Sequence, residues 1–385
     1  MRTMADLTFH RAVVISACLA LAGCQATPSA GPADKLTASN ERHMDLFGNF
    51  DLPRKIGTVE NVHVQVPVFS PDGSQLMYLR TDRDELSPMT LLGSAAHTPG
   101  DGVLSVWIRP VEGNGAGRRL SSGRWAHSAV WSRTGRSVLY VVNEPPGSTV
   151  VHVDLASGEE RRLGVAGAIN CLPRFIACEA ESVLFCTGKN PNGPFRVARQ
   201  SLRESEPTLL TPEGMDCVLP IQPGCTGKLY CARAAGERLN WAFCGPEGVT
   251  DVAADGGSSR RPEMLAAWAG ITEPLAPDGR SLMFYDPLQD RICIYHASDR
   301  RVVRHRSGSI AACWLSGDAV ALATDRGVFA VNTVTGLSPA LFDGTWLPAQ
   351  YVPAARRLLL LGKDNAARFS IVEVVFKAAA PVRQG

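Results

Sequence analysis

A turn motif followed by an apolar strand recurs along this chain of 385 residues, and it restricts the fold more than any other feature. The template copy, residues 68–73, reads VFSPDG and precedes the apolar run at residues 75–79. With its close and weaker copies, it places turns near residues 73, 135, 181, 227, 279, 317 and 355. The average spacing of these turns is close to the length of a β-propeller blade, about 40 to 50 residues.

The residues in each part of the repeat can be explained by backbone conformation and burial. In Ser-Pro-Asp-Gly, Pro presets φ, Asp bonds to its own backbone and Gly accepts a positive φ, so the motif makes a tight turn between two strands. The second strand is apolar at successive positions, as expected where neighbouring sheets cover both faces. A fourth strand carries arginines, as at residues 118–120 and 161–163, and charge on an exposed edge discourages pairing with other chains. The sequence therefore predicts an all-β propeller with seven four-stranded blades, with six or eight blades as alternatives.

Ring closure is also predicted. The third strand of the last repeat, residues 369–376, is followed by only nine residues, too few for a fourth strand and its turn. Residues 54–56 lie 17 residues before the first turn, which is where a fourth strand lies in the other repeats. We therefore expect the N-terminal segment to pair with the C-terminal strand and complete blade seven, which leaves no open sheet edge in the ring.

The pattern P-x-F-S-P-D-G with an upstream R-R-L strand resembles the WD-like repeats (WD40-like) of TolB and its relatives, over roughly residues 50–376. The resemblance implies a β-propeller, a superfold that hosts scaffolds, sugar binders, hydrolases and lyases, so it is specific for fold and not for function. TolB carries six blades behind an α/β domain, whereas this chain has a polar segment there and seven repeats.

The first segment resembles an export signal of a bacterial lipoprotein. Arg2 and Arg11 precede the apolar residues 12–22, and Gly23 and Cys24 follow, which is the tripartite pattern of a secretory signal. The ending Leu-Ala-Gly-Cys resembles a lipobox, which implies cleavage between Gly23 and Cys24 and lipidation of the Cys24 thiol. An ordinary secretory signal is the alternative. The expected organisation is a signal peptide at residues 1–23, a flexible linker at 24–50 and the propeller at 51–385.

Charge and hydropathy argue against a nucleic-acid partner and against a membrane-spanning segment. Lys and Arg number 39 against 37 Asp and Glu, and no long run of like charge occurs, so a nucleic acid is not expected as a partner. The longest apolar run, residues 12–22, falls short of the roughly 18 residues that span a bilayer. We expect a protein held at the membrane by its lipid. In the sorting rule known for the enteric lipoproteins that this segment resembles, a residue other than Asp after the Cys, here Gln25, implies the periplasmic face of the outer membrane.

The cysteines crowd into blades three and four. The sequence has 11 cysteines. Cys18 would be removed with the signal peptide and Cys24 would carry the lipid, which leaves nine. Because nine is an odd number, at least one cysteine cannot join an internal disulfide. Equivalent positions in adjacent blades are neighbours, which predicts inter-blade disulfides; small buried thiols are the alternative. No C-x-x-C pair occurs, so we expect no metal. The candidate pairs, one repeat apart, are Cys171 with Cys217, Cys178 with Cys225, and Cys186 with Cys231.

Aromatic and imidazole side chains precede several turns. Trp125, Trp268 and Trp346 lie 8 to 11 residues before the turns of blades two, five and seven, and His63 and His127 fall in the same column. These loops ring the mouth of the central channel in a propeller, where such groups can hold a peptide or a sugar by stacking and hydrogen bonds. Packing between blades is the alternative interpretation.

Catalytic signatures are absent from the sequence. The eight His are scattered, which excludes H-E-x-x-H, and no G-x-S-x-G elbow occurs. No cofactor is expected. The sequence favours a lipid-anchored, non-catalytic module of the cell envelope that binds a protein, a peptidoglycan fragment or another glycan. The alternatives are a propeller-fold polysaccharide hydrolase or lyase, and a TolB-like subunit of an envelope complex.

Overall fold

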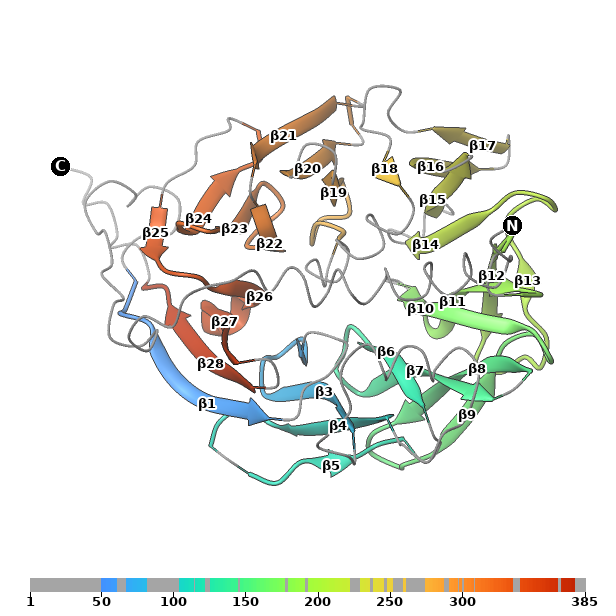
Figure 1. Ribbon diagram of the computed structural model, residues 1–385, viewed down its shortest axis with the longest axis horizontal. Helices are drawn as coiled ribbons and strands as arrows, with labels where there is room; N and C mark the ends of the chain where they lie inside the picture. The colour runs from blue at the N-terminus through green and yellow to red at the C-terminus, as the bar shows by residue number, and fades with distance from the viewer. Residues whose placement is uncertain are drawn as a thin grey trace, which may run out of the picture.

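Seven antiparallel sheets form a ring in the computed structural model (Figure 1). The structure describes residues 50–377 apart from short gaps, the longest of which are residues 82–103 and 261–273. Each sheet is one blade, and strand order runs outward from the channel. Beyond the strands, the described residues include one short 3-10 helix, η3. The all-β, seven-bladed propeller predicted from the repeats is confirmed.

The first four blades follow each other along the chain without crossovers. Blade four has five strands, because β18 pairs with β16. Blade one holds β2 (Val68–Phe69), β3 (Gln75–Thr81), β4 (Leu104–Pro110) and β5 (Arg118–Arg119); blade two β6 (Ala126–Trp131), β7 (Ser137–Glu144), β8 (Gly147–Asp154) and β9 (Glu160–Leu163); blade three β10 (Ile169–Ile176), β11 (Glu179–Gly188), β12 (Arg196–Ser201) and β13 (Thr208–Leu209); blade four β14 (Cys217–Ile221), β15 (Leu229–Ala235), β16 (Arg238–Gly245), β17 (Gly248–Asp251) and β18 (Ser259–Arg260).

Blades five to seven complete the ring. In blade five the innermost strand is reduced to a single bridge, Leu275 with Leu282, so three named strands remain among the described residues. Blade five holds β19 (Ser281–Asp286), β20 (Arg291–His296) and β21 (Arg301–Ser307); blade six β22 (Ser309–Trp314), β23 (Ala319–Thr324), β24 (Gly327–Asn332) and β25 (Ala340–Asp343); blade seven β26 (Leu347–Val352), η3 (Pro353–Ala355), β27 (Arg357–Asn365) and β28 (Arg368–Val375), with β1 (Arg54–Glu60) outermost.

The predicted turns lie where the sequence places the clearest repeats. Gly73, Gly135 and Gly279 adopt φ values of 67°, 70° and 72°, which only glycine accepts at little cost. The Asp72 carboxylate accepts hydrogen bonds from Ser70 Oγ at 2.6 Å and Ser74 N at 3.1 Å, as expected for this turn. The blade-three turn lies earlier than residue 181, between Ile176 and Glu179, and the turn near residue 227 falls outside the described residues.

Second strands are buried on both faces, as their unbroken apolar runs predict. In β7, four consecutive residues from Val138 to Val141 each expose 0% of their surface. Alternate side chains of this strand point to blades one and three. Tyr140 packs in a cluster with residues of blade one, and Leu139 packs in a cluster with residues of blade three. A single blade could not bury both faces, so the ring is the unit of folding.

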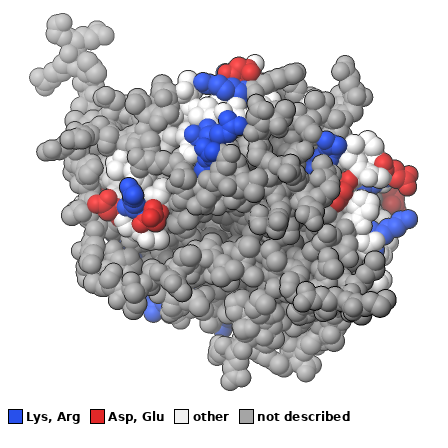
Figure 2. All heavy atoms as spheres, turned by 45° about the horizontal axis from the view of Figure 1, so that its top comes forward, with Lys and Arg blue, Asp and Glu red and all other residues white. Residues whose placement is uncertain are grey.

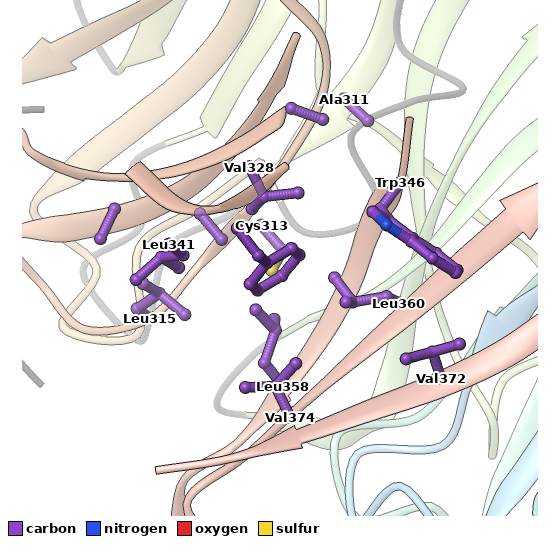
Figure 3. Close-up of a cluster of buried hydrophobic side chains, with 14 of the residues drawn as sticks. Ala311, Cys313, Leu315, Val328, Leu341, Trp346, Leu358, Leu360, Val372 and Val374 are labelled. Carbon is purple, nitrogen blue, oxygen red and sulfur yellow. The ribbon is translucent and has the colours of Figure 1, made fainter. Parts of the chain in front are cut away.

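Each interface between neighbouring blades carries its own apolar cluster in the described part of the chain. The cluster between blades six and seven contains Trp346, Cys313 and Leu360 (Figure 3). The Trp346 ring lies over Gly362, where a Cβ atom would approach to 2.5 Å of the indole. Any larger residue at position 362 would therefore displace the ring and open this interface.

The chain ends meet in blade seven. Strand β1 pairs antiparallel with β28 from Arg54 with Glu373 to Glu60 with Arg368, and Figure 1 shows the two strands side by side. The Phe50 and Phe376 rings meet edge to face, with centroids 6.0 Å apart. The predicted closure by the N-terminal and C-terminal strands is confirmed.

Two of the outermost strands are short, and one of them carries exposed charge. Strands β5 and β13 have two residues each, and Arg118 and Arg119 are exposed, which protects these edges from pairing with other chains. Figure 2 shows basic and acidic side chains of the described residues interspersed on one face rather than gathered by sign. Within the part of the chain that the structure describes, no helix has the length and apolar character needed to cross a membrane.

Candidate functional site at the inner strands

The innermost strands are irregular. A register shift interrupts β6 between His127 and Val130, and β10 between Cys171 and Arg174. Similar shifts occur in β14, β22 and β26. Bulges are frequent beside functional sites because they redirect side chains. In this ring they occur on the strands that border the channel.

Two of these bulges hold non-glycine residues in the left-handed region. Ser128 has φ 52° and Leu172 has φ 54°, at equivalent positions of blades two and three, directly after His127 and Cys171. Trp125, directly before β6, also has φ 58°. Such conformations cost about 1 to 3 kcal/mol each and persist only where the surrounding structure imposes them. Three of the four strained non-glycine residues among those described therefore border one sector of the channel.

A polar cluster is built on the strained segment of β6. Ser128 Oγ lies 2.9 Å from His127 Nδ1, and Asn143 Oδ1, at the end of β7, lies 3.1 Å from His127 Nε2. An amide oxygen only accepts hydrogen bonds, so the proton lies on Nε2 and Nδ1 accepts from the Ser128 hydroxyl. The Asn143 backbone N–H also donates to Trp125 O at 3.2 Å. All three polar side chains are half-buried, and we call them the β6 cluster.

The β6 cluster lies at one rim of blade two. The β7–β8 turn, residues 144–147, and the end of the β9–β10 connection lie at the same rim, because Ser148 N donates to Ala168 O at 3.0 Å. Burial lowers the pKa of His127, and its hydrogen bond to Asn143 opposes that shift only in part. The imidazole is therefore neutral near pH 7, and it offers hydrogen bonds rather than charge.

The predicted tryptophans pack between blades. Trp125 exposes 4% of its surface and lies in the cluster between blades one and two. Trp346 exposes 1% and lies between blades six and seven. His127 is the one predicted ligand residue that the structure places, half-buried, in a polar cluster of the described part of the chain. His63 and Trp268 lie outside the described residues, as do Gly23 and Cys24.

The described members of the predicted cysteine pairs lie on equivalent strands of blades three and four: Cys171 and Cys217 on the innermost strands, and Cys186 and Cys231 on the second strands. Cys171 lies opposite Cys186 within blade three, across β10 and β11. Cys217 and Cys231 lie in the cluster between blades three and four together with Cys244. These cysteines are thiols in the structure, and inter-blade disulfides remain a prediction. Cys178 and Cys225 lie outside the described residues.

Sequence reasoning overlooked Ser128, Asn143 and Cys244. Ser128 is the neighbour of His127 in the sequence, but its role depends on a bulge and a positive φ that no sequence pattern predicts. Asn143 had a visible signal, since it ends the apolar second strand directly before the turn residues Glu-Pro-Pro-Gly. Cys244 lies 13 residues after Cys231, a spacing suited to two strands of one hairpin.

The part of the chain that is described contains no cluster of side chains suited to bind a metal ion. No three His, Cys, Asp or Glu side chains of these residues are placed to hold one ion. The chemistry available at the β6 cluster is hydrogen bonding from a fixed hydroxyl, a neutral imidazole and an amide.

Comparison with known proteins identifies the fold. Neither a protein-family model nor a curated protein sequence matches the chain. An oligogalacturonate lyase in complex with manganese is similar in structure, with a TM-score of 0.57, 14% sequence identity, and coverage of 89% of this chain and 96% of that chain. The oligogalacturonate lyase of Vibrio parahaemolyticus also has a TM-score of 0.57, at 11% identity, with coverage of 88% and 96%. TolB from Acinetobacter baumannii has a TM-score of 0.44 and 17% identity, over 63% of this chain and 60% of that chain. At these identities the likeness to the lyases shows a shared propeller fold and not a shared activity.

Proposed function

We propose that this protein is a lipid-anchored β-propeller of the cell envelope that binds a protein or glycan ligand at the β6 cluster without catalysis. The observation that carries the proposal is the β6 cluster itself. His127 and Ser128 on the strained strand β6 are hydrogen-bonded to each other, and Asn143 at the end of β7 is hydrogen-bonded to His127. The lipid anchor at Cys24 places this surface at the membrane.

The cluster suits recognition because it is preorganised. Each polar group already has a fixed direction, so a ligand that binds there does not have to order it, and ordering costs about 0.5 to 1.5 kcal/mol for each flexible side chain. The Ser128 hydroxyl, which donates its one proton to His127, still has acceptor lone pairs for a ligand. Neutral donors and acceptors of this kind match the hydroxyl and amide groups of sugars and peptides.

A second candidate function, a polysaccharide hydrolase or lyase, is favoured by one specific observation. The Ser128 hydroxyl donates to the His127 ring, and Asn143 orients that ring, which is the order of nucleophile, base and orienting group. Two structures with the same fold are oligogalacturonate lyases by name. One feature argues against this function. The Asn143 amide carries no charge, so it cannot stabilise a protonated imidazole in the way that the buried carboxylate of a Ser-His-Asp triad does. The first lyase is described with manganese, but the residues described here contain no group of three His, Cys, Asp or Glu side chains placed to bind such an ion. The candidate reaction therefore includes no metal-assisted step.

Binding is tested with the full-length protein purified in mild detergent. Calorimetric titration with peptidoglycan fragments and with oligogalacturonides measures glycan affinity, and a photo-crosslinking amino acid at position 144, an exposed residue next to Asn143, captures a bound protein in living cells. The Asn143→Ala substitution is expected to lower the affinity for the ligand identified in this way at least about tenfold, which equals about 1.4 kcal/mol of binding free energy. Asn332→Ala is the matched control, because this half-buried asparagine ends β24 at the opposite rim.

The outcomes separate the two candidates. Binding that survives in Asn143→Ala and His127→Ala as well as it does in Asn332→Ala would refute the β6 cluster as the site. Cleavage of a glycan by the wild-type protein that Ser128→Ala abolishes, while binding is retained, would establish the enzyme instead.

A further inference from the structure

Three thiols meet inside blade four. Cys217, Cys231 and Cys244 lie on the adjacent strands β14, β15 and β16, and they share the apolar cluster that faces blade three. The Sγ atoms of Cys231 and Cys244 are 3.3 Å apart. Cys217 hydrogen-bonds to both of them through its side chain. This group, called the thiol cluster below, has no role in the proposed ligand site.

The strand register explains why two of these thiols meet. Cys231 lies opposite Ala242, and Cys244 lies opposite Leu229, so the two cysteines occupy diagonal positions on one face of the β15–β16 hairpin. A disulfide brings its sulfurs to about 2.05 Å, and side-chain rotation can close a gap of this size. Diagonal pairs lie about 7 to 8 Å apart at Cα, beyond the span of most disulfides, so forming the bond also requires a small movement of the strand backbones.

Accessibility distinguishes the members of the thiol cluster. Cys217 and Cys231 expose 0% of their surface, whereas Cys244 exposes 8% and adjoins the end of β16. Hydrogen bonds from the Cys217 and Cys231 thiols, with the positive charge of Arg233, lower the pKa of Cys244. Hydrogen bonds to Cys217 and Cys244, together with burial, raise the pKa of Cys231. Cys244 is therefore the thiolate and the nucleophile of the cluster.

We propose that Cys231 and Cys244 form a reversible dithiol–disulfide pair, oxidised by thiol–disulfide exchange with a protein or small-molecule disulfide, and that Cys217 is the third thiol that can reopen it. The Cys244 thiolate attacks one sulfur of the oxidant, forms a mixed disulfide and releases one thiolate. The Cys231 sulfur then attacks Cys244 Sγ, forms the internal disulfide and releases the second thiol of the oxidant. Two cysteines are oxidised and one disulfide is reduced to two thiols, with the Cys231 proton passing to the leaving sulfur.

The internal bond ties β15 to β16 beyond their backbone hydrogen bonds. Attack by Cys217 on Cys231 Sγ moves the bond to these two residues, which lie on the neighbouring strands β14 and β15, and frees Cys244 as a thiolate, so the oxidised state can rearrange without leaving the cluster. The interface between blades three and four would thereby respond to the redox state of the compartment, independently of ligand binding at the β6 cluster.

The test uses the full-length protein, purified under reducing conditions and then incubated with oxidised glutathione. Free thiols are alkylated and the peptides are mapped by mass spectrometry. We expect the loss of two alkylatable thiols per chain and one linked peptide pair that contains Cys231 and Cys244. Cys313→Ala, which removes a thiol buried between blades six and seven, is expected to leave this result unchanged.

Single substitutions test the order of the steps. Cys231→Ala is expected to trap one glutathione on Cys244, and Cys244→Ala is expected to give neither the linked peptide nor an adduct at Cys231. Thermal melting of each variant shows whether it folds. If a variant does not fold, the wild-type map alone decides.

Three results would overturn the proposal. The first is full alkylation of both Cys231 and Cys244 in the folded wild-type protein after oxidation. The second is a linked pair that forms only in urea. The third is a zinc or copper(I) ion held by the three thiols in protein purified without chelator, because that ion would make the cluster a metal site.

Discussion

Glu373 connects residues that lie far apart in the sequence but adjacent in the ring. Its carboxylate exposes 4% of its surface and accepts a hydrogen bond from Arg54 Nε at 2.8 Å, across the seam between β1 and β28. Arg357 Nη1 lies 3.3 Å from the same carboxylate, and Arg357 Nη2 donates to Gly73 O at 3.1 Å in the first turn of blade one. One buried charge thus joins the N-terminal strand, the C-terminal strand and the neighbouring blade.

Glu373→Gln is expected to lower the free energy of unfolding by about 3 kcal/mol, because removing one partner of a buried ion pair leaves the other charges uncompensated. Arg54→Gln is expected to have a smaller effect, since the Arg54 side chain is 69% exposed and water can replace its partner. Urea denaturation of both variants measures the difference. Equal effects would show that the carboxylate is not the central member of this group.

His305 makes the stability of the ring depend on pH. Burial, with a smaller contribution from the charge on His296, lowers the pKa of His305 to about 4, and its Nε2 has no hydrogen-bond partner among the described residues. The unfolded chain binds this proton at its ordinary pKa of about 6.5, so the unfolded state gains protons first as the pH falls. Stability therefore decreases below about pH 6.5, by about 2 kcal/mol at pH 5 from this residue alone.

Denaturation curves at pH 7.5 and pH 5 test this sign. His305→Asn is expected to remove about 2 kcal/mol of the difference between the two pH values. His127 and His152, whose pKa values burial also lowers, leave a residual dependence in the same direction. A variant with the same pH dependence as the wild-type protein would show that His305 ionises normally in the fold.

At the scale of elements, the parts of the fold that sequence predicts are those with local causes. The turns at Gly73, Gly135 and Gly279 follow from residues within each turn, and the second strands follow from unbroken apolar runs. The register of β1 followed from counting residues to the next turn. The bulge at Ser128 and the meeting of Cys231 with Cys244 depend on how strands pair and how blades face each other. The β6 cluster and the thiol cluster were therefore beyond prediction from sequence, although His127 was singled out.

The closing strand β1 supplies an element-scale prediction. A chain that begins at residue 60 lacks most of β1, including Val59, which is 1% exposed in the cluster between blades seven and one. Loss of this side chain alone costs about 2 kcal/mol, and about 1 kcal/mol shifts the melting temperature of a domain this large by roughly 2 °C. We expect the melting temperature to fall by at least several degrees.

A chain that begins at residue 50 retains the whole of β1 and is the matched control. It is expected to melt with the parent protein when both are measured by circular dichroism. If the chain that begins at residue 60 also matched the parent, β1 would add no stability to the ring.

At the scale of the whole molecule, stability is spread around the ring. Seven apolar clusters of the described residues occupy the interfaces between blades, so each blade depends on two neighbours. The β6 cluster lies on blade two and the thiol cluster between blades three and four, so either can change without the other. Charge alone does not hold the ring at a bilayer, because a chain with a net charge of only +2 has little electrostatic attraction to an anionic membrane.

Attachment is expected to depend on one sulfur, that of Cys24. Two or more acyl chains hold a protein at a bilayer almost permanently, because each buried CH₂ contributes about 0.8 kcal/mol. Cys24→Ser is expected to move the protein from the membrane fraction to the soluble fraction and to abolish incorporation of radiolabelled palmitate. Cys18→Ser, a change inside the predicted signal peptide, is the matched control and is expected to leave both unchanged. A mature protein whose first residue is not a lipidated Cys24, or a Cys24→Ser protein that still sediments with membranes, would mean that the propeller reaches the envelope by another route.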